Sequence, residues 1–420
     1  MRYAVVSRGL TIDQLRAEVK KVGAKDIREA KLLGELFCDL DQDQATVLAK
    51  VPGLVVKPVK VFQPDQQTLV EAPGVEKLWD VFTLLRSLFT PPLTGTGLTV
   101  AVLDSGVRTA HESLKEKVVY EENFTGSPSA DDILGHGTQV AFVVAGGLHG
   151  AKTAGVAPGA ALFNIKVIDD NGFGTEEDIV MGVDRVCELA VQARTQGLYA
   201  TDPLYPNVIN LSLGATDDGD PDNPLRVACR LASIDYGLDV VASAGNDGPK
   251  MTTIKVPATD PEVIAVGAIQ TYDALEIWEK SSRGPTEEGE TKPDFVLWGT
   301  DIEAASHLRD DGYVVKSGTS FSAPMLAGLT GLLWETGRRA YGEGWLFRWT
   351  AAREFAPYFC VKPADAPLKK GNTYGYGLPA MGTMLGQIAA VASPEQEVME
   401  VVAGMLMMVA MTGMITGVIE

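Results

Sequence analysis

The chain has 420 residues, which is long for one ordinary domain and sufficient for two or three. A hydrophobic content of 45% and a charged content of 22% exclude global disorder and permit a large buried core. The formal net charge of −19 argues against nucleic acid as a partner, because phosphate binding needs a basic surface.

The cysteines and the first residues indicate the compartment. The chain has four cysteines without a CxxC pair, namely Cys38, Cys187, Cys229 and Cys360. This spacing is typical of neither a zinc site nor a disulfide framework. We therefore expect free buried thiols in a reducing compartment, with two disulfide bridges as the alternative. Residues 1–21 hold no apolar stretch after their basic residue, so we expect no secretory signal and a cytoplasmic protein.

Residues 1–62 predict a small separate unit. Its period-2 and period-3.6 patterns place strands at residues 3–7, 26–31, 35–40 and 54–62, and a helix at 11–22. Asp41 can cap a second helix, with Ala45 and Leu48 directed inward. The resulting β-α-β-β-α-β order predicts an α+β, ferredoxin-like fold, which by itself gives no function.

Residues 63–94 predict a linker and activation segment. It is rich in proline, with Pro64, Pro73, Pro91 and Pro92. A short helix is expected over residues 75–88, with Trp79, Phe82 and Leu85 inward. Any cleavage between the flanking units is expected in the early part of this segment.

From residue 95 onward, apolar strand-like runs alternate with helical stretches. The runs are LTVAVLDSG, VVYEENF, GAALFNIKVI, NVINLSLG, LDVVASAGN and EVIAVGAI, and helices are expected at 176–196 and 224–236. Continuous apolar strands alternating with helices predict an α/β domain over residues 95–392, with a parallel β-sheet covered by helices on both faces. In such sheets the chemistry lies at the carboxyl ends of the strands.

Three polar residues follow those runs in positions that suit chemistry. Asp104 ends LTVAVL, His136 opens an apolar helix, and Asn246 follows VVASAG. Taken singly, each has a plain structural explanation as a turn former or a hydrogen-bonded polar residue. Of the four histidines, only His136 has glycines on both sides and an apolar helix behind it.

Ser320 lies in the stretch SGTSFSAP, among small residues that would let a substrate backbone approach its hydroxyl. Residues 325–334 have the Leu and Met spacing of a buried helix. A serine at the N-terminus of such a helix lies in a positive field that suits a nucleophile, although it could equally be only an N-cap.

Taken together, these motifs resemble the subtilisin-like serine protease (subtilase) family. VAVLDSGV, GHGTQVA, VINLSLG, VVASAGNDG, SSRGP and SGTSFSAPMLAG occur in the family's order over about residues 95–390. Residues 1–62, with their PGLVVKPV ending, are similar to the family's inhibitory propeptide.

The resemblance implies roles for particular residues. Asp104, His136 and Ser320 would form the catalytic triad, and the Asn246 side chain would stabilise the oxyanion together with the Ser320 backbone N–H. It further implies substrate-binding segments, one of Ser212, Leu213 and Gly214 that pairs with the substrate backbone and one of Ala244 and Gly245 that walls the specificity pocket. The preferred substrate side chain does not follow from these segments.

The chain departs from the family pattern at several positions. Gln139 and Met325 stand where the family often has histidine, and KPDFVLWG lacks the usual Ala-Pro before its glycine. Residues 148–153 lack the asparagine ligands that often build a calcium site. Acidic turns could also hold calcium, namely Asp131, Asp132, Asp169, Asp170, Asp217, Asp218, Asp220 and Asp222. We expect these to be solvated turns and predict no metal and no cofactor.

The C-terminal tail, residues 393–420, contains an uncharged apolar run over 401–419. It approaches the length that spans a bilayer, and Gly413 and Gly417 have a helix-packing spacing. The alternatives are a membrane tether and a Met-rich helix that packs on the protein or on a second copy.

The sequence thus predicts a serine endopeptidase made as a zymogen, with a polypeptide substrate and its own N-terminal domain as inhibitor. An inactive, peptide-binding pseudoprotease would lack a triad residue, and none is missing. A peptide ligase or cyclase on the same fold would use the same residues, so sequence leaves that alternative open.

Overall fold

The computed structural model describes residues 2–388 except 8–9, 31–34, 59–81, 84–85, 88, 148–153, 218, 222, 271–274, 343, 364, 368, 382–383 and 386–387. The chain divides into two compact units. The first comprises residues 1–60, 336–345 and 381–420, and the second comprises residues 61–335 and 346–380.

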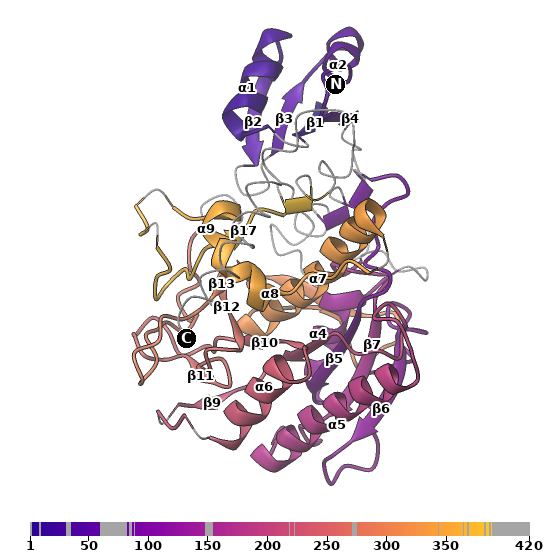
Figure 1. The fold of residues 1–420 in the computed structure, drawn as a ribbon, viewed down its shortest axis with the longest axis vertical. Coiled ribbons are helices and arrows are strands. Elements are labelled where there is room, and N and C mark those ends of the chain that lie inside the picture. The colour runs from indigo at the N-terminus through magenta and orange to yellow at the C-terminus, as the bar shows by residue number, and fades with distance from the viewer. Residues whose placement is uncertain are drawn as a thin grey trace, which may run out of the picture. The chain divides into compact units, whose positions relative to one another are not determined.

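The N-terminal part of the first unit is an antiparallel sheet with two helices, drawn in indigo in Figure 1. Its elements are β1 (Arg2–Ser7), α1 (Ile12–Lys21), β2 (Lys25–Ala30), β3 (Glu35–Asp39), α2 (Gln42–Leu48) and β4 (Leu54–Pro58). The strand order is β2-β3-β1-β4. Thr11 and Asp41 each close a capping box at the start of their helix, and Ala45 and Leu48 are buried. The predicted β-α-β-β-α-β order is confirmed.

The second unit is built on a seven-stranded parallel sheet. In spatial order the strands are β13 (Phe295–Trp298), β12 (Ile264–Ile269), β10 (Asp239–Ser243), β8 (Val208–Leu211), β5 (Thr99–Asp104), β7 (Ala161–Lys166) and β6 (Val118–Asn123). The next two strands in the sequence, β6 and β7, lie on one side of β5, and the later strands β8, β10, β12 and β13 lie on the other. The topology therefore reverses between β5 and β8, where parallel sheets form their ligand crevice.

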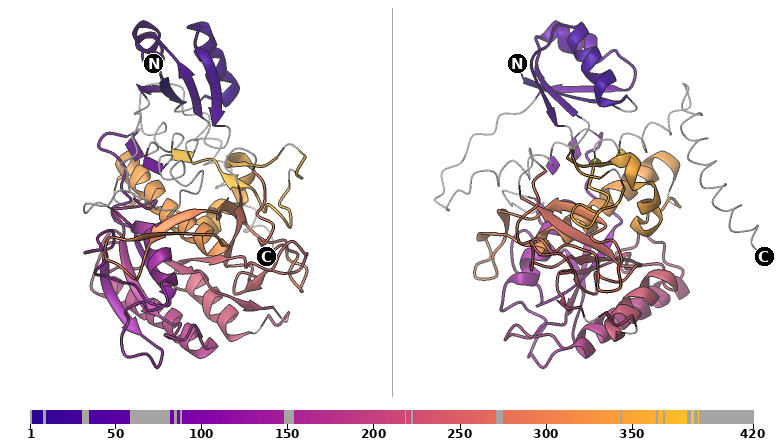
Figure 2. Two further views of the ribbon diagram at one scale, coloured as in Figure 1. Left: turned by 180° about the vertical axis from the view of Figure 1, so that it is seen from behind. Right: turned by 90° about the vertical axis from the view of Figure 1, so that its left-hand side faces the viewer.

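Helices cover both faces of this sheet (Figures 1 and 2). They are α4 (His136–Ala145), α5 (Glu176–Thr195), α6 (Pro224–Ile234) and α7 (Thr319–Tyr341). On one face, α5 and α6 share a hydrophobic core with β5, β7, β8, β10 and β12. On the other face, α4 packs against β5 and β7. The predicted α/β architecture is confirmed.

Shorter elements complete the second unit. They are β9 (Ala215–Thr216), β11 (Lys255–Val256), β14 (Ile302–Ala305), β15 (Tyr313–Lys316), β16 (Cys360–Val361), β17 (Leu378–Pro379), α8 (Trp349–Ala352), the 3-10 helix Arg353–Phe355 and α9 (Ala356–Phe359). All four cysteines are free, as predicted, and three of them are buried.

The described residues of the predicted linker pack into the second unit. Phe82 is fully buried and meets Trp298 edge-to-face, with ring centroids 6.2 Å apart. Buried Arg86 donates through Nη1 to the carbonyl oxygens of Gly155 (2.7 Å) and Val156 (3.2 Å). Phe82 is inward, as predicted, while Trp79 and Leu85 lie outside the described residues.

Among the described residues, no helix has both the length and the apolar character needed to cross a bilayer. The apolar run at 401–419 lies outside these residues, so both explanations of it stay predictions.

Candidate active site

Adjacent strands bring the predicted site residues to one edge of the sheet. Asp104 is the last residue of β5, Ser212 directly follows β8, and Asn246 lies three residues beyond β10. Because β5, β8 and β10 are successive strands of a parallel sheet, their carboxyl ends lie side by side. The fold thus brings together residues that are far apart in the sequence.

Asp104 and His136 are paired. The Nδ1 atom of His136 lies 2.8 Å from Oδ1 of Asp104, which also accepts the Ser105 backbone N–H at 2.8 Å. Asp104 is fully buried, and the imidazole is 35% exposed. Since a carboxylate only accepts, Nδ1 carries the proton, and the neutral imidazole therefore keeps Nε2 as a lone-pair base.

The surroundings of His136 change its pKa in opposing ways. Burial lowers the pKa, while the charge and hydrogen bond of Asp104 and the charge of Asp132 raise it, and the charge of Lys316 lowers it. The net pKa lies above the ordinary value of 6.5. Proton acceptance by this imidazole is therefore favoured, as a general base requires.

Asp132 holds the turn that carries His136. Its Oδ1 accepts from Ser105 Oγ (2.9 Å) and from the backbone N–H groups of Leu134 (3.1 Å) and Gly135 (2.8 Å). Its Oδ2 accepts from the backbone N–H (2.8 Å) and Oγ1 (2.6 Å) of Thr138. Asp132 is 1% exposed. The prediction of a solvated acidic turn was wrong for this residue, because these five donors replace its water.

The start of α4 packs closely on the end of β5. A Cβ atom at position 137 would lie 2.1 Å from the carbonyl oxygen of Gly106, so only glycine fits there. Gly135, the N-cap residue, has φ +92°, in the left-handed region that favours glycine. The two glycines that flank His136 are therefore needed to bring the imidazole against Asp104.

Lys166 also lies at this end of the sheet, and sequence reasoning missed it. It pairs in register with Asp104 and is fully buried. Its Nζ donates to the carbonyl oxygens of Ser105 and Asp131 (3.0 Å for Asp131) and lies 3.0 Å from Oδ1 of Asp170. A lysine at the end of a mainly apolar strand was the available signal. It ties together the loops that carry Asp104 and Asp132.

Ser320 is the second residue of α7 and contacts the Ser212 segment. Its Oγ donates to the Ser212 carbonyl oxygen (3.2 Å), and Ser212 Oγ donates to the Ser320 carbonyl oxygen (2.8 Å). The Ser320 carbonyl oxygen can accept this side-chain hydrogen bond because its usual helical donor, the backbone N–H four residues later, is missing at Pro324.

The imidazole lies near the start of α7, the helix that carries the serine. The ring of Phe321, the residue after Ser320, is 6.2 Å from the His136 ring, centroid to centroid. The hydroxyl of Ser320 points to Ser212 in this structure rather than to His136. Rotation about one side-chain bond re-aims a serine hydroxyl, and catalytic hydrogen bonds in unliganded sites often form only with substrate bound.

Asn246 is oriented by Thr319. Its Oδ1 accepts both the backbone N–H and the Oγ1–H of Thr319, each at 2.9 Å. Because a backbone N–H can only donate, the atom it meets is the amide oxygen, and the NH₂ group points away from Thr319 as a donor. That Nδ2 lies on the side of Gly318, 3.5 Å from where a Cβ of residue 318 would be.

The two predicted substrate-binding segments meet at a third residue. Short strand β9 follows Gly214 and pairs antiparallel with β11. Ala244 accepts a hydrogen bond from the Lys255 backbone N–H at 3.0 Å. Lys255 of β11 therefore joins the segment of Ser212, Leu213 and Gly214 to that of Ala244 and Gly245.

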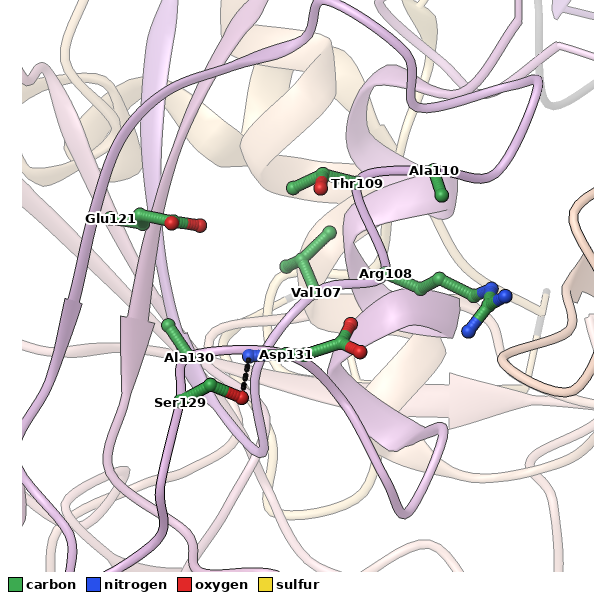
Figure 3. Close-up of a pocket in the computed structure, with 8 residues that line it drawn as sticks. All are labelled: Val107, Arg108, Thr109, Ala110, Glu121, Ser129, Ala130 and Asp131. Atoms are coloured by element: carbon green, nitrogen blue, oxygen red, sulfur yellow. Dashed lines mark hydrogen bonds between the residues drawn. The ribbon is translucent and has the colours of Figure 1, made fainter.

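A separate pocket of about 200 Å³ lies beside the loop after β5 (Figure 3). It is lined by Val107, Arg108, Thr109, Ala110, Glu121, Ser129, Ala130 and Asp131. In Figure 3 the Arg108 side chain extends away from Asp131, and Ser129 accepts the Asp131 backbone N–H. None of the predicted catalytic side chains lines this pocket.

Within the described ranges, no three His, Cys, Asp or Glu side chains form a group that could hold a metal. The carboxylate of Asp169, one of the acidic turn residues, accepts hydrogen bonds within its own turn. Its Oδ1 accepts the backbone N–H groups of Phe173 and Asn171, both at 2.9 Å, and these bonds keep the pKa of the carboxyl low, that from Phe173 most strongly.

Comparisons with known proteins identify the family of the chain. The model of the subtilase family matches residues 95–354. The chain is 29% identical over 355 residues to subtilisin of Bacillus sp. (strain TA39), covering 77% of this chain and 80% of that protein. It is 32% identical over 265 residues to the serine protease AprX of Bacillus subtilis, covering 57% of this chain and 58% of that protein.

Solved structures show the same likeness. The S41 psychrophilic protease is 26% identical with a TM-score of 0.57, covering 71% of this chain and 96% of that one. Sphericase is 27% identical with the same TM-score and the same coverage. The family model alone spans more than half of the 420 residues. The chain therefore belongs to the subtilase family.

Proposed function

We propose that this chain is a serine endopeptidase that cleaves polypeptides with Asp104, His136 and Ser320. The observation that carries the proposal is the 2.8 Å contact between His136 Nδ1 and the buried carboxylate of Asp104, beside the helix that begins with Thr319 and Ser320. This contact leaves Nε2 unprotonated, so it can serve as the proton acceptor that a serine nucleophile needs.

In the proposed mechanism, His136 Nε2 takes the Ser320 hydroxyl proton while Oγ attacks the scissile carbonyl carbon. Asp104 holds the Nδ1–H tautomer and stabilises the imidazolium that forms. The imidazolium then gives its proton to the leaving amine, and water completes hydrolysis of the acyl-enzyme by the same steps in reverse order. Its raised pKa suits His136 to hold the proton between the two transfers.

Two donors would stabilise the developing oxyanion in this mechanism. Thr319 fixes Asn246 so that its NH₂ group is free, and Ser320 contributes its backbone N–H. The latter belongs to the first turn of α7, where N–H groups have no intrahelical acceptor and the helix dipole is positive. Both donors are held by the fold before substrate arrives, which is the condition for effective transition-state stabilisation.

The N-terminal unit is proposed to serve as the inhibitor of a zymogen. The support is its element order, β-α-β-β-α-β with sheet order β2-β3-β1-β4, since the resemblance to family propeptides rests on that element order and on the PGLVVKPV ending. On this proposal the unit occupies the substrate cleft until it is cut away.

The direct test compares the wild type with Ser320→Ala by intact-mass analysis and by peptidase assay. The proposal predicts a shortened, active wild type and a full-length, inactive variant. Peptidase activity that survives Ser320→Ala would overturn the assignment of the nucleophile. A full-length but active wild type would overturn the zymogen part alone.

A further inference from the structure

Lys255 lies against both walls of the proposed specificity pocket. A Cβ atom added at Gly214 would lie 2.7 Å from Lys255 Cβ. One added at Gly245 would lie 2.5 Å from Lys255 Cγ, and Gly245 has φ +110°. Both positions therefore need glycine, because the aliphatic stem of Lys255 passes directly over their Cα atoms.

The backbone of Lys255 is fixed on both sides. In the β9–β11 ladder Lys255 pairs with Thr216, and on the other side its N–H donates to the Ala244 carbonyl oxygen (3.0 Å). The fixed backbone holds the Cβ and Cγ atoms of Lys255 against the pocket walls.

The contacts connect this stem to the catalytic groups. Gly214 lies two residues after Ser212, whose carbonyl oxygen accepts the Ser320 hydroxyl at 3.2 Å. Gly245 directly precedes Asn246, the proposed oxyanion donor. A substrate residue whose carbonyl carbon meets Ser320 Oγ would therefore extend its side chain between these two segments, toward the stem of Lys255.

The ammonium group of Lys255 is paired with an exposed carboxylate. Its Nζ pairs with the Asp247 carboxylate and lies 3.3 Å from Thr216 Oγ1. The Lys255 side chain is 19% exposed, whereas that of Asp247 is 54% exposed. Asp247 is thus the more exposed member of the pair, and because an ion pair with an exposed partner is worth little, a substrate carboxylate can displace it from Lys255.

We propose that Lys255 is a specificity-determining residue, giving the pocket a preference for an acidic side chain on the residue that precedes the cleaved bond. The inference rests on the proposed function and adds the class of substrate. A glutamate side chain can reach the ammonium group, and a lysine or arginine side chain would meet it with like charge. The stem of Lys255 also occupies volume, so the pocket disfavours large aromatic side chains.

The test measures kcat/KM for four peptide anilides that differ only in the residue before the scissile bond, namely Glu, Gln, Leu and Lys. The full chain is expressed and allowed to process, and active enzyme is counted with an irreversible serine-directed inhibitor. We expect wild type to prefer Glu over the isosteric Gln by about two- to fivefold, the upper part of the range of one partly exposed ion pair. The ratio should fall in high salt, which screens such a pair.

Three variants make the test specific. Lys255→Met keeps the stem and removes the charge, so the Glu:Gln ratio should fall to about one or below, in line with the loss of a single ion pair. Lys255→Arg should keep the preference. Asp247→Asn removes the competing carboxylate, so the ratio should rise. Lys250→Met is the matched control, an exposed lysine on the same loop, and should leave the ratio unchanged.

The outcomes are distinguishable. Cleavage by wild type with an unchanged Glu:Gln ratio in Lys255→Met overturns this inference and leaves the proposed function standing. A wild type that cleaves neither the four peptides nor any other peptide overturns the proposed function, and this inference with it. A ratio that falls in Lys255→Met and rises in Asp247→Asn supports both.

Discussion

Replacing Asp132 with asparagine is expected to damage the site without touching the triad. Both carboxylate oxygens of Asp132 face backbone N–H donors, Oδ1 those of Leu134 and Gly135, and Oδ2 that of Thr138. An asparagine has only one oxygen to offer. In either orientation its NH₂ group is directed at a backbone N–H, which is then left without an acceptor.

The cost follows from that geometry. With the amide oxygen kept toward Leu134 and Gly135, only the Thr138 backbone N–H loses its acceptor, since a hydroxyl can rotate and accept instead. One buried, unsatisfied donor costs about 1–3 kcal/mol of folding free energy. Asp132 is 1% exposed, so solvent offers little relief. The charge of Asp132 also raises the pKa of His136, so the pKa should move down in the variant.

Two assays check these effects. Urea denaturation of Asp132→Asn in a Ser320→Ala background, where no self-digestion occurs, should show the loss of stability. NMR titration of the His136 ring in the same proteins should show the lower pKa without relying on activity. The control is Asp131→Asn, which removes a neighbouring exposed carboxylate. A stability loss below about 0.5 kcal/mol, the usual scatter of neutral surface changes, together with an unmoved pKa, would refute the reasoning.

Three further predictions concern the site and its support. Because the pKa of His136 is raised, its imidazolium adds stability below about pH 6.5, and this is lost as pH rises through the folded-state pKa. Activity should do the opposite, so kcat/KM should rise with pH through that same value, and a flat profile from pH 5 to about 8 would contradict the general-base role. Asn246→Ala should lower kcat by about 10²–10³-fold with a small change in KM, the loss measured for an oxyanion donor in subtilisin, and steady-state kinetics would show it. Phe82→Ala should destabilise the second unit by about 3–5 kcal/mol in urea denaturation, since the ring is fully buried against Trp298, and a neutral result would show that this segment is not part of the core.

The sequence predicted the sheet and the site edge well, because both depend on local patterns. Apolar, β-branched runs identified the interior strands, and the glycines beside His136 marked a close approach. Strand β6 was less typical, since its burial alternates along an edge of the sheet. Strand β13 was missed, because KPDFVLWG was noted only for its departure from the family pattern.

What the sequence could not give were pairings between distant residues. Asp132 looks like any acidic turn residue until Ser105 is seen to donate to it. Lys255 has no local signal at all, because its partners Gly214 and Gly245 come from two other loops. The substrate preference therefore did not follow from the sequence, and the proposal for Lys255 rests on these three-dimensional contacts.

The central claim is that Ser320 is an activated nucleophile, and covalent labelling tests it most directly. A fluorophosphonate reagent should add one equivalent to the wild-type protein, and peptide mass mapping should place the adduct on Ser320. Ser320→Ala should take up none, and His136→Ala should react far more slowly. An adduct on another residue, or a wild type that stays unlabelled after removal of its N-terminal unit, would contradict the claim.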